Sequence, residues 1–219
     1  MTSSPDHLRP GPTALPDHVR MADVGPVGWQ VLVRDGVLRP VWGDVAAPAA
    51  VPPGPHVRAR AVRPLVPPRA VLGRAGAVWV HADGPVPPRF DVLVAPRVRR
   101  PAPHPLRVPH ECPLPPADVV RLGGVAVTTV ERTAVDVARH LPLDEAVTLL
   151  VRLAVHARLD LRAALRAAAE LGPRHGGPRV REVLARAEGA ARVPDRAAGQ
   201  TEGWTGAAGS PAALDPVIR

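Results

Sequence analysis

The sequence predicts an α+β fold: a partial winged-helix-like N-terminal module, then a small β-sheet followed by a C-terminal segment of about four helices. Three observations predict this fold. A helical apolar pattern over 27–34 is followed by an Asp-Gly turn at 35–36 and a second apolar stretch typical of a hairpin. Two apolar runs flank a Gly-Gly pair at 123–124, which supplies the positive φ that a tight hairpin turn needs. Apolar residues then recur at helical spacing over 128–188.

The N-terminal part divides into two segments. Residues 1–25 are rich in proline and have no periodicity, so we expect a disordered lead-in. Residues 26–55 are expected to form a degenerate winged-helix-like module and a linker, with a helix over 27–34 and a hairpin around Arg39-Pro40. The amphipathic helix that opens a complete winged helix is not found in the first 25 residues.

Residues 56–188 are expected to form one α+β domain. Its first half is predicted from apolar runs bounded by proline and glycine. The expected elements are a helix over 56–66, a helix or strand over 69–81, a strand over 90–94, a short strand from Leu106, and a hairpin over 118–128.

The second half of this domain is expected to be helical. Thr128 and Glu131 fit a capping box at the start of the first helix, and Arg132 and Asp136 are spaced to form an ion pair on it. Three more helices are expected over 143–157, over 161–171 with Asp160 as the cap, and over 177–188. Residues 189–219 are rich in Ala, Gly and Pro, and a disordered tail is expected there.

The composition argues against most kinds of catalysis. The formal net charge is +8, and all 28 basic residues are arginine. Without lysine there is no phosphate-loop or Schiff-base lysine, and serine occurs only at positions 3, 4 and 210. We therefore expect a protein that is not an enzyme, with no catalytic residue and no cofactor. No apolar run approaches the roughly 20 residues of a membrane helix, so a cytoplasmic protein without a membrane partner is expected.

The positive charge indicates nucleic acid only weakly, because an excess of arginine is also what GC-rich codons produce. The best candidates for contact with duplex DNA are polar side chains on the predicted helix and hairpin, and the densest basic run offers phosphate contacts or forms a solvated loop. These candidates are Gln30, Arg34, Arg39, Arg97, Arg99 and Arg100.

Two clusters could hold a metal ion, but a structural explanation is favoured for both. His104, His110 and Cys112 offer three ligands where a zinc site needs four, so no metal site is expected. The second cluster is an acidic set whose members are better explained as caps and ion pairs than as ligands for phosphoryl chemistry. This set is Asp91, Asp118, Glu131 and Asp136.

The segment VAVTTVERTAVDVAR at 125–139 resembles the V-x-V-T-[ST]-P-E-R-T-A-x-D-[LV]-A-R signature of the AbiEi-type antitoxin family of type IV toxin–antitoxin systems, in particular its long actinobacterial members. The likeness extends over about 27–188. It implies a winged helix that binds the promoter of its own operon, an α/β domain, and a nucleotidyltransferase-type toxin as partner, with no cofactor and no enzymatic activity.

By position, the family motif falls on Thr128, Glu131, Arg132, Thr133 and Asp136, which we interpret as structural: a cap, and an ion pair that ties the helix to the hairpin. Val130 stands where the family has proline, and the nuclease-like extension of some long relatives has no counterpart in the tail. Two alternatives remain open: a protein-interaction module that does not bind DNA, and a truncated remnant of a relative with a nuclease domain.

Overall fold

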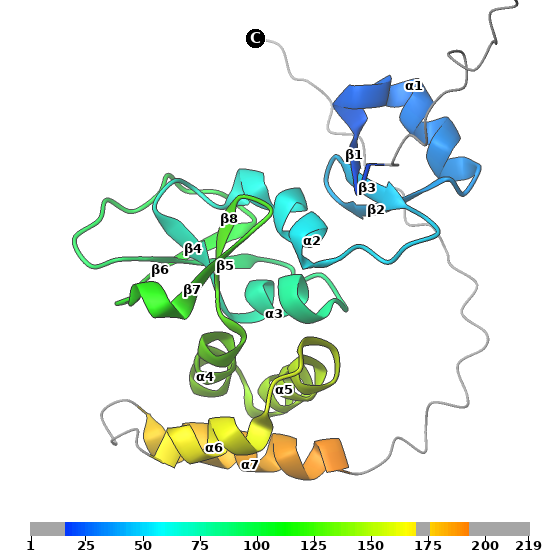
Figure 1. Cartoon of the computed structure of the whole chain (residues 1–219). Coiled ribbons are helices and arrows are strands. Elements are labelled where there is room, and N and C mark those ends of the chain that lie inside the picture. The colour runs from blue at the N-terminus through cyan, green and yellow to red at the C-terminus, as the bar shows by residue number, and fades with distance from the viewer. Residues whose placement is uncertain (1–15, 170–175, 193–219) are drawn as a thin grey trace, which may run out of the picture.

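The computed structural model describes residues 16–169 and 176–192, and in these ranges the chain has an α+β fold with seven α-helices and two β-sheets (Figure 1). A three-stranded sheet and one helix form an N-terminal module. A five-stranded sheet and the remaining helices form the body. In Figure 1 the helix α2 lies beside this sheet, and the helices α3 to α7 lie in successive layers below it. The predicted α+β class is therefore confirmed.

The N-terminal module is built from β1 (Val19–Arg20), α1 (Met21–Arg34), β2 (Leu38–Trp42) and β3 (Val45–Pro48). Its strands are antiparallel in the order β1-β3-β2. The predicted disorder of 1–25 is wrong from residue 16 onward, while residues 1–15 lie outside the described ranges. The early start of the helix is stabilised by the Asp23 carboxylate, which accepts a hydrogen bond of 2.8 Å from the Arg20 backbone N–H, as the third residue of a capping box does.

The hairpin of this module turns at Gly43 and Asp44, where Gly43 has a φ of 57°. The predicted turn at Arg39-Pro40 is wrong, because both residues lie within β2. Proline is tolerated there since β2 is an edge strand of the sheet, and the strand register shifts between Pro40 and Trp42.

The body contains a mixed five-stranded sheet in the order β6-β5-β4-β8-β7. The pairs β4–β8 and β5–β6 are parallel, and the pairs β4–β5 and β7–β8 are antiparallel. The strands are β4 (Ala70–Leu72), β5 (Phe90–Val94), β6 (Arg107–Glu111), β7 (Val119–Leu122) and β8 (Val125–Thr128).

The helices of the body follow the predicted order with several changes of boundary. The helix predicted over 56–66 ends at Ala61 and is followed by a 3-10 turn at Arg63–Leu65. Residues 69–81 are a strand and a helix separated by Gly73, where a Cβ would lie 2.8 Å from a Leu93 side-chain carbon. The last helix continues to Arg192, past the predicted end at 188. The predicted end of the third helix at 171 and the predicted tail over 193–219 lie outside the described residues. The helices are α2 (Pro55–Ala61), α3 (Arg74–Ala82), α4 (Val130–His140), α5 (Leu143–Ala157), α6 (Leu161–Ala169) and α7 (Gly177–Arg192). Among the described residues no helix combines the length and the apolar character needed to cross a membrane.

The core consists of two main clusters, one among the helices α3 to α7 and one between the sheet and α2 and α3. Phe90 lies at the centre of the second cluster, in edge-to-face contact with Trp42 at 5.6 Å and Trp79 at 6.1 Å between ring centroids. Because Trp42 belongs to the β2–β3 hairpin, this contact packs the N-terminal module against the body.

The turn between β7 and β8 packs closely against α2. A Cβ on Gly123 would lie 2.3 Å from the His56 carbonyl oxygen, and the Gly123 N–H donates to His56 Nδ1 at 3.1 Å. We expect Gly123→Ala to destabilise the protein by about 1–3 kcal/mol through this overlap with backbone, measured by urea denaturation.

The neighbouring Gly124 is the matched control, because it also has a positive φ but a Cβ added there would meet no atom within 4 Å. Gly124→Ala is expected to cost about 1 kcal/mol, from the left-handed backbone alone. Equal losses for the two variants would show that the contact with α2 contributes nothing.

Candidate nucleic-acid interface

The helix α1 is broken at Gly25, whose φ of 71° and ψ of 163° are not helical. The second piece begins at Pro26, a residue favoured at a first helical position. Trp29, 5% exposed, anchors this piece against Leu38 and Ala46 of the sheet. The break therefore separates a short helical turn from a helix that is held on one side by the sheet.

The opposite side of this helix faces solvent. Val27, Gln30, Val31 and Arg34 recur at helical spacing, and all four are exposed. Val27 is 78% exposed, which is unusual for a large apolar side chain. The face therefore presents one amide, one guanidinium and two apolar side chains in a single stripe.

These side-chain types suit the edges of bases in the major groove. Arginine pairs with two acceptors of guanine, glutamine pairs with the donor and acceptor of adenine, and an apolar side chain contacts the thymine methyl group. Phosphate contacts need cations instead. The stripe on α1 can therefore discriminate between bases but adds little electrostatic attraction.

The N-terminal module is close to neutral. Residues 16–54 contain three arginines and four aspartates. Arg20 pairs with Asp44 at 2.8 Å, a hydrogen bond that raises the pKa of Arg20, and Arg34 pairs with Asp35 at 2.9 Å. Arg39 is exposed and donates to the Val51 carbonyl oxygen at 3.4 Å.

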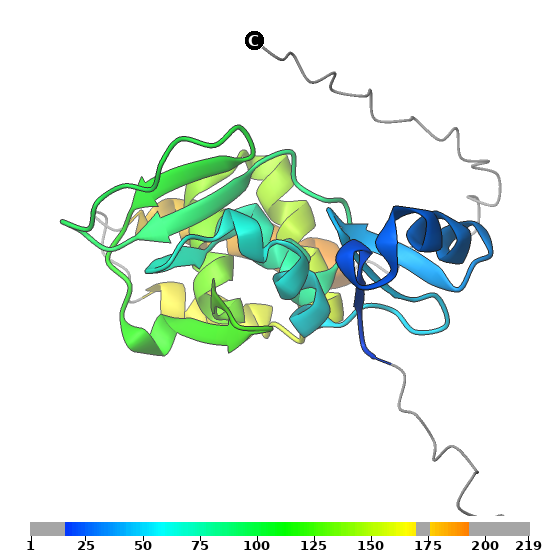
Figure 2. The same ribbon diagram turned by 90° about the horizontal axis from the view of Figure 1, so that it is seen from above.

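The predicted DNA-contact residues fall into two separate places. Gln30, Arg34 and Arg39 lie together in the N-terminal module. The basic run lies in the loop after β5, at the end of the body away from α1 in both views (Figures 1 and 2). Its three arginines, Arg97, Arg99 and Arg100, are exposed and form no ion pair with the described residues. The structure therefore does not bring the two groups into one surface.

The motif residue Arg132 lies at the centre of a network that joins α4 to the hairpin. Its Nε donates to Asp136 at 2.9 Å and its Nη1 to Asp118 at 2.8 Å. Its Nη2 lies 2.9 Å from the Cys112 Sγ. Burial acts to lower the pKa of Arg132, but the hydrogen bonds to Asp136 and Asp118 outweigh burial and raise it above its ordinary value. The predicted Arg132–Asp136 pair is present.

The motif threonines have roles different from those predicted. Thr129 is the N-cap of α4 and accepts from the Arg132 backbone N–H at 3.2 Å. Thr128 is fully buried, and its hydroxyl lies 2.6 Å from that of Thr133. The predicted capping box of Thr128 and Glu131 is therefore wrong by one residue, because Thr128 still belongs to β8 and pairs with Val119.

The acidic residues considered for metal binding are in separate clusters. Asp91 lies 2.6 Å from His110 Nε2 and 3.5 Å from Arg74, while Asp118 and Asp136 are held by Arg132. Within 16–169 and 176–192, no group of three or more His, Cys, Asp or Glu side chains is arranged to hold a metal ion. Each of these three aspartates thus has a partner within the protein.

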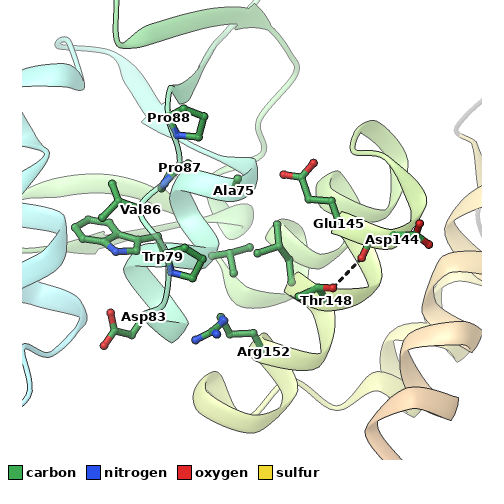
Figure 3. A pocket seen from close by; sticks show the side chains of 13 residues that line it. Ala75, Trp79, Asp83, Val86, Pro87, Pro88, Asp144, Glu145, Thr148 and Arg152 are labelled. Atoms are coloured by element: carbon green, nitrogen blue, oxygen red, sulfur yellow. Dashed lines mark hydrogen bonds between the residues drawn. The ribbon is translucent and has the colours of Figure 1, made fainter. Parts of the chain in front are cut away.

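A hollow of about 410 Å³ lies between α3, the segment 83–88 and α5 (Figure 3). It was not predicted from the sequence. Val78, Trp79 and Leu149 contribute to its largely apolar wall. Glu145 and Arg152 lie at opposite ends of the α5 side of this hollow (Figure 3). The proline-rich segment DGPVPP after α3 is the feature of the sequence that corresponds to this hollow. The residues that line the hollow do not include a paired nucleophile and base.

No family model and no curated protein matches the chain. Among solved structures, the chain is similar to the crystal structure of the RV2827C protein from Mycobacterium tuberculosis. The two share 17% sequence identity over 80% of this chain and 76% of that chain, with a TM-score of 0.38. A likeness at that level carries no argument about function.

Proposed function

We propose that the protein is a transcriptional regulator of the AbiEi antitoxin type that binds duplex DNA through α1, and that it is not an enzyme. The observation that carries the proposal is the break at Gly25. It leaves the helix from Pro26 to Arg34 anchored by Trp29, with Gln30 and Arg34 directed to solvent. This helix, the Asp35-Gly36 turn and the β2–β3 hairpin follow one another as in the second half of a winged helix.

In this proposal the helix enters the major groove and the body supplies electrostatic attraction. Residues 55–169 contain seventeen arginines and nine acidic residues, so the body attracts polyanions. The resemblance of the 125–139 segment to the AbiEi signature supports two further parts of the proposal. These are the promoter of its own operon as the DNA and a nucleotidyltransferase-type toxin as the protein partner, without a cofactor.

Loss of the Arg34 guanidinium is expected to weaken binding to a specific duplex by about 1–3 kcal/mol, the usual contribution of one good base contact. Fluorescence anisotropy measures this with a labelled duplex from immediately upstream of the gene and a shuffled duplex of equal length. Gln30→Ala should weaken specific binding by a similar amount. On the shuffled duplex, Arg34→Ala should weaken binding by no more than the loss of one charge explains, and Gln30→Ala should leave binding unchanged because glutamine carries no charge.

Arg186→Ala is the matched control, because it removes an exposed arginine from α7 while leaving α1 intact. Equal weakening of both duplexes by Arg34→Ala would contradict base contact by α1. Wild-type binding that does not fall as salt is raised would contradict a DNA function of any kind.

The near-neutral charge of the N-terminal module favours a second candidate, a protein-interaction module that does not bind DNA. The same titration separates the two. If the wild-type protein binds neither duplex at low salt and co-purifies with the product of the adjacent gene, the second candidate is correct.

A further inference from the structure

A basic hollow of about 770 Å³ lies on the body, where the 3-10 turn η2 (Arg63–Leu65) and the start of β4 face the β7–β8 hairpin. Three exposed arginines line it: Arg63, Arg69 and Arg121. No acidic residue is among the residues that line it. This concentration of positive charge in a concave surface sets the hollow apart from the loop after β5.

The charge of these three arginines is not compensated by the protein. None of their side chains forms an ion pair or a hydrogen bond with the described residues, whereas the side chain of the nearby Arg60 pairs with Asp17 at 3.3 Å. The chain has no acidic residue at all from Val45 to Ala82. Like charges held near one another cost free energy unless a counter-charge is present, so the hollow is suited to an anion.

The backbone around the hollow is held by strand pairing that does not involve the three arginine side chains. The strands β4 and β8 pair at Leu72 and Val127, and the residues of β4 that line the hollow, Ala70 and Val71, come before this pair. Arg69 follows two prolines and has a φ of 66°, in the left-handed region that non-glycine residues seldom adopt. Arg97, in the loop after β5, has the same φ of 66°, so the two arginines differ in their surroundings and not in this backbone angle.

We propose that this hollow binds a small molecule that carries two or more phosphate groups, with the guanidinium groups of Arg63, Arg69 and Arg121 as its ligands. Planar guanidinium groups bind phosphate oxygens in pairs, and three of them match more than one phosphate. The volume lies within the range of small-molecule sites. A concave site of this size suits a compact polyphosphate better than the convex backbone of a duplex. Apolar lining residues such as Val66 and Val119 can contact the part of the ligand that carries no phosphate.

The test is calorimetric titration of the full chain with pyrophosphate, ATP, inorganic phosphate and adenosine. We expect pyrophosphate and ATP to bind more tightly than inorganic phosphate, and adenosine not to bind. The double variant Arg69→Ala/Arg121→Ala should weaken polyphosphate binding by about tenfold or more, since it removes two charged hydrogen-bond donors. The matched control is Arg97→Ala/Arg99→Ala, which removes the same charge from exposed positions of the β5–β6 loop and should change binding by about twofold or less.

Arg69→Gly adds a readout that a misfolded variant could not give. Glycine adopts the left-handed backbone without cost, so this variant should unfold at the same or a higher temperature while binding polyphosphate more weakly. Unchanged polyphosphate binding in Arg69→Gly would contradict the role of the Arg69 guanidinium.

Two results would overturn the proposal. The first is wild-type protein that binds none of the polyphosphates. If Arg69→Ala/Arg121→Ala then loses duplex binding, the hollow contacts DNA phosphates, and the proposal for α1 is unaffected. The second is equal weakening by the two double variants, which would mean attraction to net charge only.

Discussion

Replacing Arg132 with alanine is expected to lower the free energy of unfolding by about 3–5 kcal/mol. The reason is the carboxylate of Asp136, which is 3% exposed and would lose its partner at 2.9 Å. Asp118 would lose its hydrogen bond to the same guanidinium. An ion pair at a protein surface contributes little, but a buried charge without a partner is costly. Urea denaturation followed by circular dichroism measures the difference.

The pair of Arg186 and Glu182 provides a control with the same spacing on a helix. It also spans four residues and has a distance of 2.9 Å, but both side chains are 55% exposed. Arg186→Ala should therefore cost about 0.5 kcal/mol or less. In the Arg132→Ala background, Asp136→Asn should recover part of the loss because it removes the unpaired charge. If Arg132→Ala costs no more than Arg186→Ala, the structural interpretation of the motif fails.

The contacts of Arg132 limit what the family motif indicates about function. Thr128, Thr133 and Asp136 are buried, and the polar contacts of Arg132 are with residues of the same chain. Four of the five motif side chains are therefore occupied by contacts within the protein, and Glu131 is exposed. Contacts of this kind preserve a fold and do not by themselves identify a ligand. The case for DNA binding therefore depends on α1, which lies outside the motif.

The elements that could be predicted depend on local physical chemistry. The hairpin at 123–124 follows from two glycines that both adopt positive φ, and α5 has the predicted bounds of 143–157. Asp160 caps α6 as predicted, with the Ala163 N–H donating to it at 2.9 Å. In each case the deciding interaction spans only a few residues, so a single sequence contains it.

The elements that could not be predicted depend on contacts distant in the sequence. Thr128 and Thr129 are equally good caps, and the choice between them is made by the pairing of Thr128 with Val119 across the β7–β8 hairpin. The order of the five-stranded sheet brings β4 beside β8. This order also assembles the basic hollow from Arg63, Arg69 and Arg121, which no local pattern connects.

The second large effect is expected for Phe90→Ala, which should lower the free energy of unfolding by about 3–5 kcal/mol. Phe90 is 1% exposed and its ring contacts Trp42 and Trp79 edge to face. Removing it leaves a cavity between the five-stranded sheet, α3 and the hairpin. Phe90→Leu keeps most of the buried area and loses mainly the aromatic contacts, so it should cost less.

The position of Phe90 also predicts which part of the protein Phe90→Ala destabilises most. Because Trp42 joins the β2–β3 hairpin to the body at this ring, Phe90→Ala should let the hairpin open before the rest of the protein unfolds. Amide hydrogen exchange of residues 38–48 should then accelerate more than that of α5. Leu150→Ala is the control, since Leu150 is 0% exposed in the cluster of helices, on α5 and away from the hairpin. Equal acceleration of the hairpin amides in both variants would mean that the N-terminal module is not held through Phe90. The packing of Val57 and Ala61 of α2 against Val45 and Ala47 of β3 would then hold the module in place.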